Sequence, residues 1–239
     1  MDFREGEIIC LNKPYGMSSF GALARVRFLI TKAIGGAKVK MGHAGTLDPL
    51  ATGVLILCTG KKTKDIESLQ GESKEYVATL KLGATTASYD REHTVDATFP
   101  TSHITEELIR KTLMSFEGET EQVPPAYSAC KIGGKRAYKM ARKGEDVNLK
   151  PRKLRIDGIN IENFDPKTMM LTIRIRCGKG TYIRALARDI GAAMGSGAFL
   201  TALCRTRLGD VSLDKCVGMD DIPGWIRCQL GENVWKSAS

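Results

Sequence analysis

The sequence GHAGTLDPLATGVL, residues 42–55, combines four turn-forming residues, a histidine and one carboxylate, Asp48. Pro49 fixes its own φ angle and disfavours the helical region for the residue before it, so we expect Asp48 on a rigid, extended turn. The run VLILC, residues 54–58, has the length and composition of a buried strand that would anchor this turn in the core. A rigid, anchored polar turn is suited to holding a reactive group.

Length and composition predict a single globular domain over residues 1–239. The chain is 42% hydrophobic and 26% charged, which is enough apolar material for a sizeable core and too little charge for disorder. No apolar run approaches the eighteen residues of a membrane span, and the charged start of the chain precedes no long apolar region. We therefore expect a soluble, cytoplasmic protein with no membrane partner.

The cysteines and histidines argue against a metal site. The seven cysteines are odd in number, far apart and without a C-x-x-C pair, so we expect reduced and mostly buried thiols. None of the three histidines stands at a metal-ligand spacing from another histidine or from a cysteine. We expect no metal.

Nearly all of the net charge of +9 comes from residues 126–155. This segment holds ten Lys and Arg residues against Glu145 and Asp146, which gives it a local charge of +8. A concentrated basic patch would attract a phosphate backbone, although a solvated surface carries such charge just as readily. The segment alone leaves both interpretations open.

Apolar periodicity predicts a mixture of helices and strands. Helices are expected at residues 20–33 after a cap at Ser18 or Ser19, at 63–69 with Thr63 as cap, after a cap at Thr105, at 137–143, and from about 182 to 194. Strands are expected at residues 7–11, 54–58, 75–82, 155–161, 169–177 and 199–207. Because strands and helices do not alternate regularly, the pattern favours an α+β fold, with a mixed, largely antiparallel sheet flanked by helices, over a doubly wound fold.

Two common enzyme signatures are absent from the sequence. The segment TGKKT, residues 59–63, lacks the glycine of a phosphate-binding loop, because Leu55 stands at that position. There is also no G-x-S-x-G elbow, the commonest signature of serine hydrolases.

Three residues remain as candidates for chemistry: Asp48 on its turn, Tyr76 near the start of a strand, and Arg184 in the first turn of a helix. An arginine about 4 Å from a carboxylate attracts it by roughly 4 kcal/mol at an effective dielectric near 20, and keeps it ionised. An oriented aspartate anion could act as a nucleophile or as the electrostatic partner of a cationic sugar.

Each candidate also has a structural interpretation. Asp48 could stabilise an Asx turn, and Arg184 could form an ordinary ion pair with another acid. Tyr76 could be a half-buried strand residue.

Five motifs, taken together and in their order along the chain, resemble those of a known protein family. They are LNKPYGMSS at 11–19, GHAGTLDPLATGVL at 42–55, KEY at 74–76, QVPPAYSA at 122–129 and KGTYIR at 179–184. Over residues 7–215 the sequence closely resembles the bacterial tRNA pseudouridine synthase B (TruB) family, and its DPLATG form is similar to the stand-alone enzymes rather than their RNA-guided relatives. The resemblance implies the pseudouridine synthase fold.

The resemblance implies an isomerase that needs no metal or organic cofactor. It would convert a uridine in the T-loop of tRNA, at the position corresponding to uridine 55, to pseudouridine by base flipping, glycosidic bond cleavage and reattachment through C5. By position, Asp48 matches the catalytic aspartate, Arg184 the arginine that pairs with it, and Tyr76 the tyrosine that stacks on the base and assists proton loss. The residues that match the lining of the nucleotide site are His43, Tyr182 and Leu203.

The resemblance also assigns a role to the basic segment. Residues of about 124–153 correspond to an RNA-gripping insertion, which would contact the T-arm and elbow of tRNA through Lys135, Arg136 and Lys139. We expect a monomer without an obligate protein partner.

The end of the sequence departs from the family pattern. Many relatives have an arginine at the position of Cys204, and many end in a PUA domain, whereas only a tail of about residues 215–239 follows here. We expect no full PUA domain, and we expect Trp225 and Trp235 in this tail to pack on the catalytic domain.

Two other functions are compatible with the same residues. A non-catalytic RNA-binding protein or tRNA-folding chaperone would flip bases without chemistry, so that Asp48 would be dispensable. A pseudouridine synthase acting on another RNA site would keep the role of Asp48 and modify a different position.

Overall fold

The computed structural model describes residues 2–128 and 130–231, which belong to two compact units. The first unit is Met1–Glu75 with Cys204–Ser239, and the second is Tyr76–Leu203. Strands β4 (Lys74–Leu82) and β12 (Ala198–Leu208) each begin in one unit and end in the other.

Ten strands of the described chain form one sheet in the order β14-β1-β3-β12-β4-β11-β10-β7, with β13 beside β12 and β2 beside β3. The pairs β1–β14 and β3–β12 are parallel, whereas β1–β3, β2–β3, β7–β10, β10–β11 and β12–β13 are antiparallel. The predicted α+β fold with a mixed, largely antiparallel sheet is confirmed.

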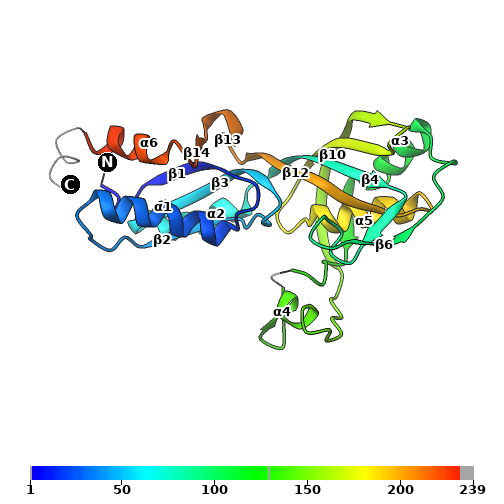
Figure 1. Cartoon of the computed structure of the whole chain (residues 1–239), viewed down its shortest axis with the longest axis horizontal. Helices are drawn as coiled ribbons and strands as arrows, with labels where there is room; N and C mark the ends of the chain where they lie inside the picture. The colour runs from blue at the N-terminus through cyan, green and yellow to red at the C-terminus, as the bar shows by residue number, and fades with distance from the viewer. Residues whose placement is uncertain (1, 129, 232–239) are drawn as a thin grey trace. The chain divides into compact units, whose positions relative to one another are not determined.

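The first unit packs helices against short strands. Its elements are β1 (Ile8–Lys13), α1 (Ser19–Ala33), β2 (Met41–Ala44), β3 (Thr52–Thr59), a 3-10 helix (Gly60–Asp65), α2 (Ile66–Gly71), β13 (Val211–Ser212), a second 3-10 helix (Leu213–Lys215), β14 (Val217–Gly218) and α6 (Ile222–Leu230). In Figure 1, α1 runs alongside β1 and β3.

Strand β3 separates two apolar clusters. Leu55 and Leu57 pack with buried residues of α1 and α6, while Val54, Ile56 and Cys58 pack toward α2. The predicted buried strand at residues 54–58 is therefore confirmed, with apolar layers on both of its faces.

The second unit contains the remaining strands and the basic segment. Its further elements are β5 (Ala84–Thr86), β6 (Val95–Thr98), α3 (Glu106–Met114), β7 (Gly118–Gln122), β8 (Lys131–Ile132), β9 (Lys135–Arg136), α4 (Ala137–Ala141), β10 (Arg152–Asp165), β11 (Met170–Cys177) and α5 (Ile183–Ala193). In Figure 1 the segment that carries α4 extends away from the other strands of this unit.

Helix capping follows the sequence in two of three cases. Ser18 accepts a hydrogen bond from the backbone N–H of Gly21 at the start of α1, and Thr105 accepts one from Leu108 at the start of α3. The predicted cap at Thr63 is wrong: this residue lies inside the 3-10 helix that begins at Gly60, and its hydroxyl donates to the Gly60 carbonyl at 2.8 Å.

The tail and the thiols follow the predictions in part. Trp225 packs against Phe3 with 6.0 Å between ring centroids, as expected, while Trp235 lies outside the described residues. Of the cysteines, Cys58, Cys130 and Cys177 are buried, Cys10, Cys204 and Cys216 are partly buried, and Cys228 is exposed. No helix in the described part of the chain is both long and apolar enough to span a membrane.

Gly53 offers a test of the β3–β12 contact. Its φ of +102° is unfavourable for other residues, and a Cβ there would overlap the backbone of Arg205 in the neighbouring strand. We expect Gly53→Ala to lower the free energy of unfolding by roughly 3 kcal/mol. Gly16→Ala is the matched control, because its φ is +78° but nothing lies near its Cβ, and it should cost about 1 kcal/mol. Equal losses in denaturant unfolding would contradict the proposed overlap.

Candidate functional site

Asp48 lies in the loop that joins β2 to β3, on a turn closed by a hydrogen bond from the Ala51 N–H to the Asp48 carbonyl at 3.1 Å. The two flanking residues are fixed by contacts with the first residue of α1 and with the segment before it. The Ser19 hydroxyl both donates to the Leu47 carbonyl at 2.9 Å and accepts from the Leu47 N–H at 2.8 Å. On the other side, the Gly16 N–H donates to the Pro49 carbonyl at 2.9 Å. These hydrogen bonds, which we call the clamps on the Asp48 turn, fix the backbone on both sides of the half-buried carboxylate.

A buried lysine lies under this turn. The Lys13 side chain is fully buried, and its ammonium donates to the carbonyls of Pro14, Met17 and Pro49 at 2.9, 2.6 and 3.4 Å. Burial lowers the pKa of Lys13 to about 8, an effect that the charge of Asp48 opposes and that of Arg205 reinforces. Lys13 is therefore protonated at neutral pH and adds positive charge near Asp48.

A second buried cation is hydrogen-bonded to both ends of the loop that carries Asp48. Arg205 on β12 is 1% exposed, and its guanidinium donates to the Val54 carbonyl at 2.8 Å through Nε and to the Gly45 carbonyl at 2.9 Å through Nη2. The two acceptors stand on either side of Asp48 in the sequence, so Arg205 ties together both ends of its loop.

His43 on β2 is electrically neutral at pH 7. Burial lowers its pKa below the ordinary value of 6.5, and the nearby Arg205 charge lowers it further. Its Nδ1 is buried and has no hydrogen-bond partner among the described residues. A neutral ring suits contact with an uncharged base, since an imidazolium would pay a larger desolvation penalty.

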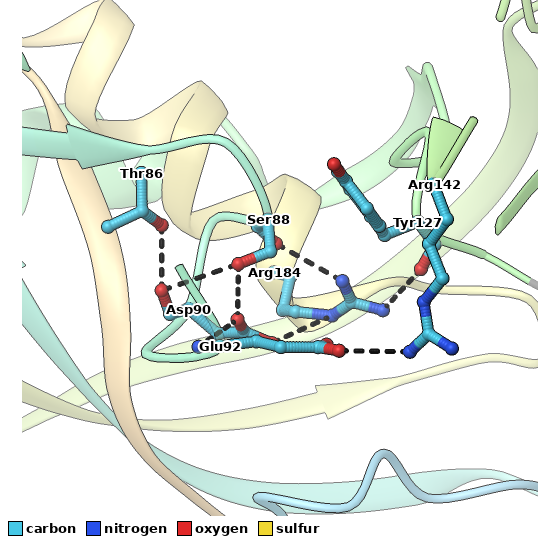
Figure 2. A network of polar contacts seen from close by, with 7 residues as sticks. All are labelled: Thr86, Ser88, Asp90, Glu92, Tyr127, Arg142 and Arg184. Carbon is cyan, nitrogen blue, oxygen red and sulfur yellow. Dashed lines mark hydrogen bonds and ion pairs between the residues drawn. The ribbon is translucent and has the colours of Figure 1, made fainter. Parts of the chain in front are cut away.

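In the second unit, Arg184 lies in the first turn of α5 and is 5% exposed. Its Nη1 donates to the Ser88 carbonyl at 3.1 Å and its Nη2 to the Tyr127 carbonyl at 2.9 Å. Its Nε lies 3.6 Å from Oδ2 of Asp90 (Figure 2). These contacts fix the plane of the guanidinium.

Asp90 was not among the site residues predicted from the sequence. This carboxylate is 6% exposed, and its Oδ1 accepts hydrogen bonds from the Ser88 hydroxyl at 2.6 Å and the Glu92 N–H at 2.9 Å. The Thr86 hydroxyl donates to its backbone carbonyl at 2.7 Å. The alternating polar pattern Thr86-x-Ser88-x-Asp90 was the available signal, but nothing in it indicated a contact with residue 184.

The network extends to the basic segment. Glu92 forms an ion pair with Arg142, which follows α4, at 3.1 Å (Figure 2). The ring of Tyr127 lies 4.7 Å from that of His93. The Arg184 site is thus linked to residues on both sides of α4, Tyr127 before it and Arg142 after it.

The other predicted lining residues occupy separate places. Tyr76 is buried on β4, and Leu203 is half-buried on β12. Tyr182 precedes α5; its backbone N–H donates to the Gln122 side chain at 2.9 Å, and its hydroxyl lies 3.2 Å from the Cys130 sulfur. Burial, together with the Cys130 contact, raises the pKa of Tyr182 to about 12, so this phenol stays protonated at neutral pH.

The predicted RNA contacts of the basic segment are all exposed. Lys135 and Arg136 form the second strand of a small hairpin, and Lys139 lies on α4.

Asp48 and His43 belong to the first unit, whereas the remaining predicted site residues belong to the second. The pairing of Asp48 with Arg184 therefore stays a prediction.

Comparison with known proteins identifies relatives of this chain. A model of the TruB family pseudouridylate synthases, N-terminal domain, matches residues 32–183. The chain is 57% identical over 235 residues to tRNA pseudouridine synthase B of Bacteroides thetaiotaomicron, covering 98% of both proteins. It is 42% identical to the protein of that name from Dehalococcoides mccartyi, covering 90% of this chain and 69% of that one.

The fold also has relatives among solved structures. A chain in the crystal structure of a Cbf5–Nop10–Gar1 complex aligns with a TM-score of 0.71 and 25% identity, covering 99% of this chain and 60% of that one. This match agrees with the predicted pseudouridine synthase fold.

The buried Lys13 predicts a specific pH dependence. Its pKa is about 8 in the folded protein and near 10.5 when unfolded, so the unfolded state binds more protons between these values. The free energy of unfolding of the native protein should therefore rise relative to that of Lys13→Met between pH 8 and 10.5, by at most about 3 kcal/mol. Denaturant unfolding at pH 7.5 and 10 measures this difference. An exposed control, Lys38→Met, should show no such change, and a pH-independent difference for Lys13→Met would refute the assignment.

Proposed function

We propose, because the chain belongs to the TruB family of pseudouridylate synthases, that it converts a uridine in the T-loop of tRNA, at the position corresponding to uridine 55, to pseudouridine. The enzyme is an isomerase: the N1–C1′ bond breaks, a C5–C1′ bond forms, the proton on C5 is lost and N1 gains one. The observation that carries the proposal is the clamped turn, which holds a carboxylate between two fixed backbone positions.

Asp48 is assigned the chemistry at the ribose. Its carboxylate would face the electron-poor C1′ as the glycosidic bond breaks, either adding to it or stabilising its positive charge. The clamps on Leu47 and Pro49 support this role, because a fixed anion needs no reorganisation when the charge develops.

Arg184 is assigned to the electrostatic control of this carboxylate. Its guanidinium already has fixed acceptors in Asp90, Ser88 and Tyr127, so bringing it to a second carboxylate would cost little side-chain entropy. Asp90 acts through Arg184 and is a positioning residue in this scheme.

Four residues are assigned to the flipped base. Tyr76 would stack on the uracil and assist removal of the C5 proton, while Leu203 would supply an apolar wall. His43, as a neutral ring, would contact the base, and Tyr182, with a pKa of about 12, would act as a hydrogen-bond donor rather than as a base at neutral pH.

Asp48→Asn tests the catalytic assignment. The change keeps the size of the side chain and removes its charge, so we expect tRNA binding within about twofold of the native protein and no detectable pseudouridine in a single-turnover assay. Ser18→Ala, which removes only the cap of α1, serves as a control for mild destabilisation. Pseudouridine formation by Asp48→Asn would overturn the mechanism, and mapping of total RNA from cells would show whether another site is modified instead.

The basic segment is assigned to binding of the T-arm and elbow of tRNA. Replacing Lys135, Arg136 and Lys139 together with Gln should weaken binding and reduce the slope of log K against log salt by about 2 to 3, because each lost phosphate contact removes about 0.7 to 0.9. The matched control replaces three exposed lysines elsewhere: Lys38, Lys111 and Lys167. Equal slopes in the two triple variants would mean that this segment is only a solvated surface.

A further inference from the structure

Tyr15 and Phe20, which neighbour in sequence the two residues hydrogen-bonded to the Asp48 loop, have exposed aromatic side chains and no role in the assignments above. Tyr15 is 58% exposed and Phe20 is 67% exposed, although both lie in the well-packed first unit. Leaving a phenylalanine ring in water forgoes roughly 1.5–3 kcal/mol of burial free energy. Single exposed apolar residues are common, so the position of these two carries the argument.

Each of these residues is the sequence neighbour of one of the clamps on the Asp48 turn. Phe20 directly follows Ser19, whose hydroxyl holds both backbone groups of Leu47. Tyr15 directly precedes Gly16, whose N–H holds the carbonyl of Pro49. The backbone that carries the two rings is thus fixed to the residues immediately before and after Asp48.

The surrounding charge suits a polyanion. Helix α1, which begins beside Phe20, carries Arg25, Arg27 and Lys32 and no acidic residue. Lys13 and Arg205 add two buried positive charges beneath the same loop. Exposed aromatic rings among basic residues are the usual means of binding unpaired nucleotides, whose bases stack on the rings.

We propose that Tyr15 and Phe20 form a stacking surface for unpaired RNA bases adjacent to the uridine that reaches Asp48. The inference rests on the proposed function, since it takes the occupant of the Asp48 site to be a nucleotide of an RNA loop. Bases next to an extruded uridine lose their own stacking partner, and an aromatic ring fixed beside the site replaces it.

The first experiment measures binding without turnover. In the Asp48→Asn background, the Kd for a T-arm RNA hairpin should rise about tenfold for Phe20→Ala and for Tyr15→Ala, within the range for loss of one stacked base. Phe28→Ala is the matched control: this ring is 61% exposed on the same helix but lies about 12 Å further along it, and its loss should change Kd less than twofold. Phe20→Trp should retain binding and Phe20→Leu should not.

The second experiment identifies the stacked base. Each loop nucleotide flanking the target uridine is replaced in turn by an abasic residue, and each RNA is measured against each protein variant. At one abasic position, the loss caused by Phe20→Ala should disappear, because protein ring and RNA base form a single interaction.

Three results would overturn the inference. These are an unchanged Kd for both alanine variants, an equal loss for Phe28→Ala, and additive losses at every abasic position. A change in the oligomeric state of the free protein with Phe20→Ala, without a change in Kd, would assign the rings to a contact between copies instead. Because these readouts use the inactive background, they are independent of the pseudouridine assay that tests the proposed function.

Discussion

The buried guanidinium of Arg205 fixes the loop on which the proposed chemistry depends. It bridges the carbonyls of Gly45 and Val54, at the two ends of the segment that carries Asp48. A buried cation is costly unless its donors are satisfied, and two carbonyl acceptors offset part of that cost. Lys13, buried beside the same loop, interacts electrostatically with the half-buried Asp48 carboxylate and adds a second buried positive charge. The loop that carries Asp48 therefore has an electropositive surround.

The second unit also contains a buried arginine, Arg184, whose acceptors differ in kind from those of Arg205. Arg184 donates to two carbonyls and forms an ion pair with Oδ2 of Asp90, while Oδ1 of Asp90 accepts from the Ser88 hydroxyl and from the Glu92 N–H. One partner of Arg184 is therefore an acid and the other two are neutral carbonyls, and the ion pair buries two charges. Pairs of this kind contribute more to orientation than to stability, because desolvation offsets most of the attraction.

The sequence predicted what depends on local pattern. The buried strand at 54–58, the caps at Ser18 and Thr105 and the position of Arg184 at the start of a helix all follow from spacing and residue type. The predicted helix cap at Thr63 was wrong because this residue lies inside the 3-10 helix that begins at Gly60, where its hydroxyl donates to the Gly60 carbonyl. Asp90, Lys13 and Arg205 were missed as site residues for another reason: Arg205 contacts a residue 160 positions away, and Lys13 one 36 positions away. No local pattern encodes such contacts, and only the family resemblance singled out Asp48 over a structural turn.

The position of Lys13 also makes it an internal reporter of loop opening. When the turn opens, water reaches the Lys13 amine and its pKa returns toward the ordinary value of 10.5, so that it then reacts as a surface lysine does. Its complete burial keeps acylating reagents away from it while the turn is closed. The rate at which Lys13 is acylated therefore measures how often the segment before α1 separates from the Asp48 loop, a local opening that hydrogen exchange of the Leu47 and Gly16 amides would follow independently.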